Sequence, residues 1–312
     1  MSSIDPRHDP RAFFHRPELM QLPWVESPFF EQLLQSSGLD DEQKELARRF
    51  SRDGLLTLDL EIDDFEDRAR RIQEDLGPRY PVGNRRIHEA WMFNDDVRAL
   101  ATHSKVLSVL QMLYGREPIP FQTLNFEVGT QQLGHSDVVH FYSRPRRFMC
   151  GVWIALEDID DQNGALFYYP GSHRLPEYDF DDLGLKPDIE EYPVYESFVR
   201  VLTVAEGLEP KELHLKPGSA VIWAANLLHG GSPVKDPSRT RQSQVTHYFF
   251  EGGAWYMPLG SDPFGGDVCF REVIDLKTGH FVPQTIRGQS IDLATRKNVW
   301  RYPRPLPDWV RD

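Results

Sequence analysis

The part of the chain that most constrains its fold runs from residue 119 to residue 251. It is a succession of short segments rich in β-branched and aromatic residues, separated by glycine, proline and aspartate or asparagine turns. Strands of this length and spacing bury their apolar faces by packing two sheets together. We therefore expect a mainly β fold, a double-stranded β-helix of the jelly-roll, cupin-like type. The expected strands cover residues 121–129, 138–143, 147–157, 165–169, 198–204, 211–215, 219–224 and 241–251.

The residues before this core predict helices instead. Residues 40–52 begin with a capping aspartate and an acidic first turn, and they end in basic residues before Gly54, as the helix dipole favours. Amphipathic patterns predict two more helices, over residues 64–76 and 95–114, and a short strand over 55–60. We expect these N-terminal helices to pack on one sheet of the β-helix.

The 312 residues are expected to form a single domain, because large β folds often reach this size as one unit. An N-terminal arm, rich in proline and aromatic residues, precedes the helical support, and a C-terminal extension follows the core. Within the core lies an acidic insertion with little regular pattern; insertions of this kind are often lids or binding loops, and the sequence leaves the role of this one open. These parts are residues 1–40, 41–118, 119–251 and 252–312, with the insertion at 174–210.

Composition excludes several classes of protein. The net charge of −13 would repel a nucleic acid, and no long basic run offsets it. Cys150 and Cys269 are the only cysteines, which suits a reducing compartment, although one bridge between them is an alternative. The N-terminus lacks a signal-peptide pattern, and no apolar run approaches a membrane span. We expect a cytoplasmic protein that acts on a small molecule; the sequence leaves its oligomeric state open.

One histidine has the spacing of a metal chelate. On a strand, residues i and i+2 project to the same side, so His135 and Asp137 could reach one ion. No other histidine in the chain has an acid two residues later. His229 is the best third ligand, because it ends an apolar strand beside two glycines that permit close backbone approach. Two imidazoles and one carboxylate are typical of non-haem iron(II) oxygenases. Structural histidines, hydrogen-bonded in the core, are the alternative.

An arginine completes this pattern. An iron(II) site with one carboxylate suits an α-keto acid, and the far carboxylate of 2-oxoglutarate would need a fixed cation, for which the planar guanidinium is well shaped. Arg241 begins the last core strand, where an arginine is otherwise awkward to bury. Arg239 is its competitor, and an exposed turn arginine is the alternative for either.

Over roughly residues 45–255 the chain resembles the phytanoyl-CoA dioxygenase-like family of iron(II)- and 2-oxoglutarate-dependent oxygenases. The most specific part is residues 151–173: an apolar strand, an acidic turn, Asn163-Gly-Ala-Leu166 and then Pro170-Gly-Ser-His173. Lys216-Pro-Gly-Ser-Ala220 and the run from Arg241 to Tyr248 also fit, and the latter favours Arg241 over Arg239.

The resemblance implies a set of roles. His135, Asp137 and His229 would bind Fe(II), and Arg241 would pair with 2-oxoglutarate. The enzyme would use O2 to hydroxylate a small molecule at an unactivated C–H bond, releasing succinate and CO2. Asp137 is retained, which points to hydroxylation rather than halogenation. Weaker candidates for co-substrate contacts are Gln122, Asn125 and Trp153; Asn125 lies near a position where the family often has lysine.

Two other functions remain open at this point. One is a cupin-type metal enzyme that does not use 2-oxoglutarate, such as an isomerase or a dioxygenase, and the other is a non-catalytic jelly-roll binding module. A coenzyme A ester is not favoured as substrate, because no basic patch for its phosphates is evident. Several further residues are expected to be structural or solvated: His140 in the core, His173 at a turn or the pocket mouth, Arg144, Arg146 and Arg147 in a solvated loop, and Tyr168, Tyr178, Tyr192, Tyr195 and Trp255 as core filling or a stacking surface.

Overall fold

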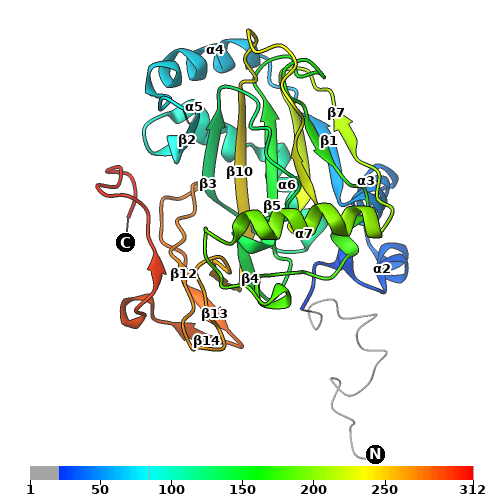
Figure 1. Ribbon diagram of the computed structural model, residues 1–312, viewed down its shortest axis with the longest axis vertical. Helices are drawn as coiled ribbons and strands as arrows, with labels where there is room; N and C mark the ends of the chain where they lie inside the picture. The colour runs from blue at the N-terminus through cyan, green and yellow to red at the C-terminus, as the bar shows by residue number, and fades with distance from the viewer. Residues whose placement is uncertain (1–20, 84, 312) are drawn as a thin grey trace, which may run out of the picture.

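A six-stranded antiparallel sheet forms the centre of the molecule (Figure 1). The computed structural model describes residues 21–83 and 85–311. The sheet order is β1 (Leu55–Asp59), β8 (Ser219–Ala224), β5 (Met149–Ala155), β10 (Ser243–Phe250), β3 (Pro118–Phe126) and β2 (Arg86–His88). Every residue of β5 and β10 is buried, so both faces of this sheet are covered.

A smaller sheet faces one side of the main sheet. It has the order β7 (Lys211–Leu213), β6 (Leu166–Tyr168) and β9 (His229–Gly231), and side chains of both sheets line one cavity. The two sheets stay separate and do not close into a barrel. This arrangement confirms the expected mainly β fold of the double-stranded β-helix type.

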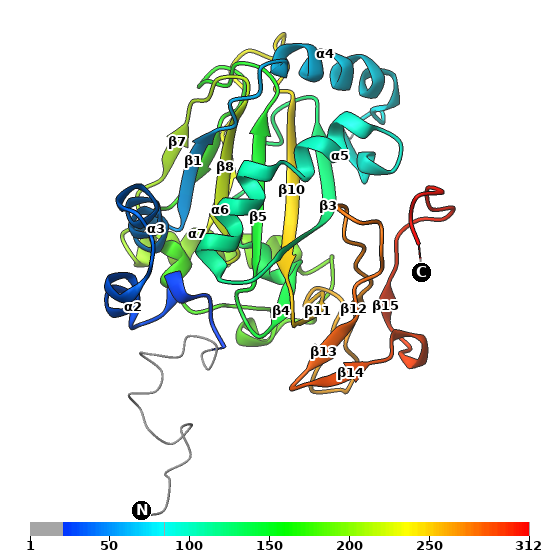
Figure 2. The ribbon, with the colours of Figure 1, turned by 180° about the vertical axis from the view of Figure 1, so that it is seen from behind.

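Helices lie against the other side of the main sheet (Figure 2). Phe50, Ile72 and Leu110 of the helices share one core cluster with Val152 and Ile222 of the sheet. The helices are α2 (Phe30–Ser36), α3 (Asp41–Asp53), α4 (Phe65–Leu76), α5 (Asp95–Ala101) and α6 (Ser104–Tyr114). Apolar burial between the two layers therefore fixes the sheet whose opposite face lines the cavity.

The helix boundaries follow the expected signals with one exception. At α3 the Asp40 carboxylate accepts a hydrogen bond from the Gln43 backbone N–H, the Gln43 side chain accepts from the Asp40 N–H, and Gly54 ends the helix at φ 74°. The single helix expected over 95–114 is divided, because His103 adopts an extended conformation between α5 and α6. Residues 1–20 of the expected arm lie outside the described residues, and its remainder contains η3 (Trp24–Glu26) and α2.

The strand expected over residues 198–204 is wrong, because this segment belongs to helix α7 (Tyr192–Ala205). Its β-branched residues favour a strand locally, but Tyr195, Val199 and Leu202 are buried at helical spacing. Helix α7 crosses in front of the main sheet in Figure 1. The expectation that the insertion has little regular structure is thus corrected.

The segment expected as a strand over 138–143 is instead a short 3-10 turn, η6 (Asp137–Val139), followed by β4 (Tyr142–Arg144). Strand β4 joins a sheet otherwise built from the C-terminal extension. The strands of the extension are β11 (Ala254–Tyr256), β12 (Phe270–Arg271), β13 (Gln284–Ile286), β14 (Gln289–Ile291) and β15 (Val299–Trp300). Cys150 and Cys269 are both free and buried. None of the helices in the described part of the chain has the length and apolar character needed to cross a bilayer.

Two substitutions in α7 test its helical assignment. In a strand, residues 202 and 204 would share a face, whereas in the helix Leu202 is 9% exposed and Val204 is 78% exposed. We expect Leu202→Ala to lower the free energy of unfolding by about 2–3 kcal/mol, because it leaves a cavity under the helix. Val204→Ala should change it by less than about 0.5 kcal/mol. Similar losses for both variants in denaturant titrations would contradict the helix.

Candidate metal centre and active site

A direct backbone pairing brings the two histidines of the candidate metal site together. His135 and His229 form an isolated antiparallel bridge in which each backbone N–H donates to the other's carbonyl at 3.0 Å. The two imidazole rings lie 4.6 Å apart between centroids. His229 begins β9, where Gly230 is required because a Cβ there would lie 2.6 Å from the Gln132 carbonyl oxygen. The bridge thus depends on the glycine that follows the second histidine.

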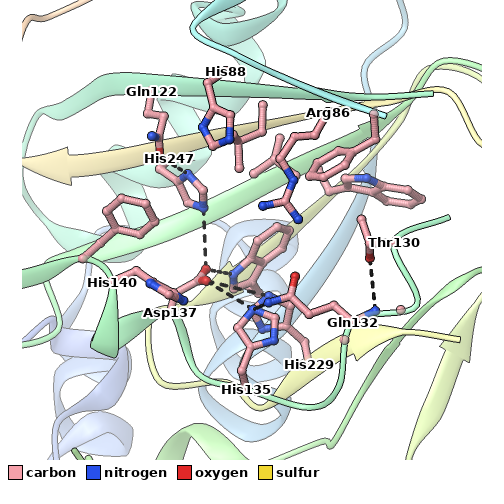
Figure 3. Close-up of a pocket in the computed structure, with 18 of the residues that line it drawn as sticks. Arg86, His88, Gln122, Thr130, Gln132, His135, Asp137, His140, His229 and His247 are labelled. Carbon is pink, nitrogen blue, oxygen red and sulfur yellow. Dashed lines mark hydrogen bonds and ion pairs between the residues drawn. The ribbon is translucent and has the colours of Figure 1, made fainter. Parts of the chain in front are cut away.

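Asp137 reaches the same point from a turn rather than from a strand. It begins η6, and the Ser136 hydroxyl accepts a hydrogen bond from the Val138 backbone N–H at the start of that turn. The regular-strand argument for the pair His135 and Asp137 is therefore corrected, although both side chains point to one site (Figure 3).

The three side chains have the geometry of a metal-binding triad. Asp137 Oδ1 lies 3.8 Å from His135 Nε2 and 4.0 Å from His229 Nε2. One ligand atom from each residue lies within 4.8 Å of the other two, and all three residues are buried. Ligand atoms about 2 Å from a shared ion lie roughly 3–4 Å apart, so one ion fits between them after small adjustments.

Hydrogen bonds orient both imidazoles for this role. His135 Nδ1 lies 2.9 Å from the Leu133 carbonyl oxygen, and His229 Nδ1 lies 2.9 Å from that of Leu227. A carbonyl can only accept, so each Nδ1 carries the proton and each Nε2 presents a lone pair to the site. Burial, and next the neighbouring His229, lower the pKa of His135 to about 3, which keeps this imidazole neutral.

The other oxygen of Asp137 is held by residues of the main sheet. Trp223 Nε1 donates to Asp137 Oδ2 at 2.7 Å, and His247 Nε2 lies 3.7 Å from the same oxygen. Burial raises the pKa of Asp137, but interactions with neighbouring histidines, first His229 and then His247, outweigh it and hold the pKa well below its usual range. Gly151 makes room for the indole, because a Cβ there would lie 2.2 Å from the Trp223 ring. Asp137 is thus an oriented carboxylate.

The triad opens into a cavity of about 380 Å³ that also contains Arg241. Arg241 is 4% exposed, and its guanidinium lies over the rings of Trp153 at 5.2 Å and Phe126 at 5.5 Å. Its Nη1 donates to the Ser243 hydroxyl at 3.0 Å, and its Nε has no hydrogen-bond partner. Burial lowers the pKa of Arg241 to about 10, so the group stays charged at neutral pH.

No carboxylate lies within ion-pair distance of Arg241 among residues 21–83 and 85–311. A buried, unpaired guanidinium is costly unless a ligand pairs with it. The competitor Arg239 has a partner already, because its Nη1 lies 2.9 Å from both carboxylate oxygens of Asp160. Arg241, not Arg239, therefore fits an acidic ligand.

The sequence of this chain is related to those of known proteins. The family model described as phytanoyl-CoA dioxygenase (PhyH) matches residues 39–243. The chain belongs to the phytanoyl-CoA dioxygenase family. The peroxisomal phytanoyl-CoA dioxygenase of Bos taurus is 25% identical over 175 residues, which are 54% of this chain and 45% of that protein. Phytanoyl-CoA dioxygenase domain-containing protein 1 of Danio rerio is 35% identical over 78 residues, 23% of this chain and 27% of that protein. The chain thus matches less than half the length of these curated relatives.

Solved structures share the fold. The epimerase SnoN, solved in complex with Fe3+, alpha ketoglutarate and nogalamycin RO, superposes with a TM-score of 0.58 at 20% identity, covering 72% of this chain and 88% of that one. EctD from S. alaskensis with bound Fe gives a TM-score of 0.51 at 22% identity, covering 69% and 78%. At these sequence identities the similarity supports the double-stranded β-helix fold, and the function has to be inferred from the residues of the site.

The weaker co-substrate candidates lie in different places. Gln122 and Trp153 line the cavity of this family member, and Gln122 Oε1 lies 3.1 Å from His247 Nδ1. Asn125 does not line it: Gln122, Leu124 and Phe126 face the cavity, and alternation along β3 turns Asn125 to the opposite side. Its strand partner Gln244 donates a hydrogen bond to the Val97 carbonyl of α5, which confirms that this side faces the helices.

His140 is a correction to the sequence-based reading. We expected His140 to be a structural residue in the core, but η6 turns the chain, and His140 lines the cavity with Nε2 3.1 Å from the Tyr192 hydroxyl. His173 is buried away from the cavity, with Nε2 3.2 Å from the Ser51 carbonyl oxygen. Arg147 is not solvated, because it pairs with Glu26 at 2.7 Å and with Glu177 at 2.8 Å.

The five aromatic residues that the sequence suggested as core filling or a stacking surface mainly pack in the core. Tyr195 and Trp255 are buried in one apolar cluster, which Tyr178 and Tyr192 border, and Tyr168 belongs to a second cluster. Sequence reasoning missed other cavity residues because long-range strand pairing places them there: Arg86, His88, Trp223, His247, Met257, Leu259, Arg271 and Trp300.

Removing one ligand tests the metal site, with His140 as a matched control. We expect Asp137→Ala to lose stoichiometric Fe(II) binding, because it removes the only carboxylate that lines the described cavity. His140→Ala should retain bound iron, because His140 lies outside the triad. Anaerobic iron titration of both variants, alongside thermal unfolding, measures this. Near-normal iron affinity in Asp137→Ala would contradict the triad.

Proposed function

We propose that this protein is an iron(II)- and 2-oxoglutarate-dependent dioxygenase that hydroxylates a small molecule at an unactivated C–H bond. The observation that carries the proposal is the unpaired, buried guanidinium of Arg241 in the same cavity as His135, Asp137 and His229. The site thus offers a metal position and a fixed cation, the two groups that an α-keto diacid needs.

The triad fits iron(II) by its donor set and by its openness on one side. Two imidazoles and one carboxylate occupy one side of the site, and the cavity lies on the other, leaving room for a chelating co-substrate. Bound iron would supply the dioxygen chemistry, with 2-oxoglutarate converted to succinate and CO2 as the substrate gains a hydroxyl group. Trp223 would keep Asp137 oriented as a ligand through its indole N–H.

Arg241 would hold the far carboxylate of 2-oxoglutarate. Its surroundings, Trp153, Phe126 and Val245, are apolar, so a carboxylate paired there would interact more strongly than in water. The neighbouring Ser243 hydroxyl, which already accepts a hydrogen bond from Arg241, fixes the direction of the guanidinium. A co-substrate seated between the triad and Arg241 would place its keto acid end on the metal.

The other two functions fit the cavity less well. A metal enzyme that ignores 2-oxoglutarate, or a binding module without metal, gives no partner to Arg241. The cavity is also near the lower end of the ~300–1,000 Å³ range of small-molecule pockets, which supports a small substrate. Related folds include an alpha ketoglutarate dependent epimerase and a carbocyclase, so hydroxylation is the part of the proposal that product analysis has to test.

Arg241→Gln tests the co-substrate anchor, and Arg239→Gln is its control. With Mn(II) as an unreactive metal, we expect Arg241→Gln to weaken 2-oxoglutarate binding at least tenfold, since a lost hydrogen bond to a charged group costs about 1.5–3 kcal/mol. Arg239→Gln should bind it normally, because Arg239 pairs with Asp160 outside the cavity. Calorimetric titration measures both. Equal affinities in the two variants would contradict the assignment of Arg241.

A further inference from the structure

A second arginine enters the cavity without a partner. Arg86 lies on β2, and Figure 3 shows its side chain extending into the same cavity as the triad. Its guanidinium lies 5.0 Å from the centre of the Phe126 ring, and its Nε is buried without a hydrogen-bond acceptor. Within residues 21–83 and 85–311, Arg86 makes no ion pair, whereas the adjacent Arg85 pairs with Glu127 outside the cavity. The guanidinium of Arg86 is therefore available to pair with an anionic ligand in the cavity.

A third arginine, Arg271 of β12, lines the same cavity. It is 1% exposed and lies 3.7 Å from the centre of the Trp300 ring, while its nearest carboxylate, Glu89, is 3.8 Å away. His88 lines the cavity as well, and burial, Arg86, His247 and Arg271 lower its pKa. Arg86 and Arg271 thus both add positive charge to the wall of the cavity.

A count of the charges in the cavity, with iron(II) and 2-oxoglutarate bound, shows which cation lacks a counter-charge. Iron(II) with Asp137 carries one net positive charge, and 2-oxoglutarate with Arg241 carries one net negative charge, so these four groups cancel. Glu89 lies beside Arg271, which leaves Arg86 as the cation with no counter-charge among the described residues. Arg86 is partly buried and its Nε has no hydrogen-bond partner, so an anion bound beside it would replace the hydration that the guanidinium has lost.

Apolar side chains form much of the remaining cavity wall. Phe141 and Trp300 lie against Arg271, with ring centres 5.1 and 3.7 Å from its guanidinium. Met257 and Leu259 of the C-terminal extension and Ile189 of the insertion also line the cavity. The cavity therefore combines positive charge with apolar surface.

We propose that Arg86, supported by Arg271, binds an anionic group of the substrate, a carboxylate or a phosphate, whose apolar body lies against Phe141, Trp300 and Ile189. This inference rests on the proposed function, because it assigns Arg241 to the co-substrate and Arg86 to the substrate. The enzyme acts on small acids with an apolar body, and selects them against neutral analogues by the guanidinium fork of Arg86.

The test uses benzoate, phenyl phosphate and the uncharged benzamide as probes. Each is titrated calorimetrically into protein already loaded with Mn(II) and saturating 2-oxoglutarate. We expect at least one of the anions to bind roughly tenfold or more tightly than benzamide, as loss of a charged hydrogen-bond partner implies. Whichever anion binds more tightly identifies the headgroup as carboxylate or phosphate.

Variants of the two neighbouring arginines show which residue is responsible. Arg86→Gln should remove the preference for the anion while leaving 2-oxoglutarate affinity within about threefold of wild type, and Arg86→Lys should restore part of it. Arg85→Gln, the matched control, should behave as wild type. Thermal unfolding of each variant shows that the fold is retained.

Three results would overturn the proposal. They are equal or absent binding of the anions and benzamide, displacement of 2-oxoglutarate by the anions, and a loss of 2-oxoglutarate affinity in Arg86→Gln as large as that in Arg241→Gln. Failure of the wild-type protein to bind 2-oxoglutarate in the presence of metal is a separate result. It would reject the proposed function itself.

Discussion

The paired backbone hydrogen bonds between His135 and His229 are the constraint on which the rest of the site depends. They join the loop after β3 to the start of β9, so two segments distant in sequence present their imidazoles to one point. Asp137, two residues after the first histidine, is then carried to the same point by the turn that follows. A change in this pairing would move all three ligands at once.

The two sheets hold the bridge from opposite sides. The smaller sheet supplies β9. The main sheet supplies Trp223 and His247, which face Oδ2 of Asp137, the carboxylate oxygen that points away from the two histidine ligands. The helices on the far side fix the main sheet by apolar burial, and Gly151 leaves the space in which the indole lies. The helices thus position the main sheet, the main sheet positions the Trp223 indole, and the indole orients the Asp137 carboxylate.

Charge is the second feature that organises the cavity. Asp137 is the only acid among the cavity-lining residues that the structure describes, while Arg86, Arg241 and Arg271 all reach it. Arg241 and Arg86 have no carboxylate partner among the described residues, so an anion in the cavity would pair with guanidinium groups that have lost part of their hydration. This charge distribution supports the two proposals made above, that Arg241 pairs with the co-substrate and Arg86 with an anionic substrate.

His135, Asp137, His229 and Arg241 could be singled out from the sequence, because a His-x-Asp spacing, a histidine before two glycines and an arginine opening a strand are local patterns; the structure brings all four to one cavity. The sequence also predicted most core strands and the helix caps. Prediction failed where local and tertiary preferences differ. The β-branched residues of α7 favour a strand locally, but the segment is a helix that buries one of its faces. His140 reaches the cavity because η6 turns the chain. Asn125 lies away from the cavity through strand alternation. Trp223, His247, Arg86 and Arg271 join the site only through long-range pairing, for which a single sequence carries no local signal.

The most direct test of the central claim is an anaerobic titration of the metal-free protein with Fe(II) and then with 2-oxoglutarate, followed by visible absorption. If the triad and Arg241 form one site for iron and the co-substrate, a charge-transfer band of the chelated keto acid will appear and saturate, and it will require both components. Stoichiometric iron binding without such a band at saturating 2-oxoglutarate would contradict the account and favour a metal enzyme that does not use this co-substrate.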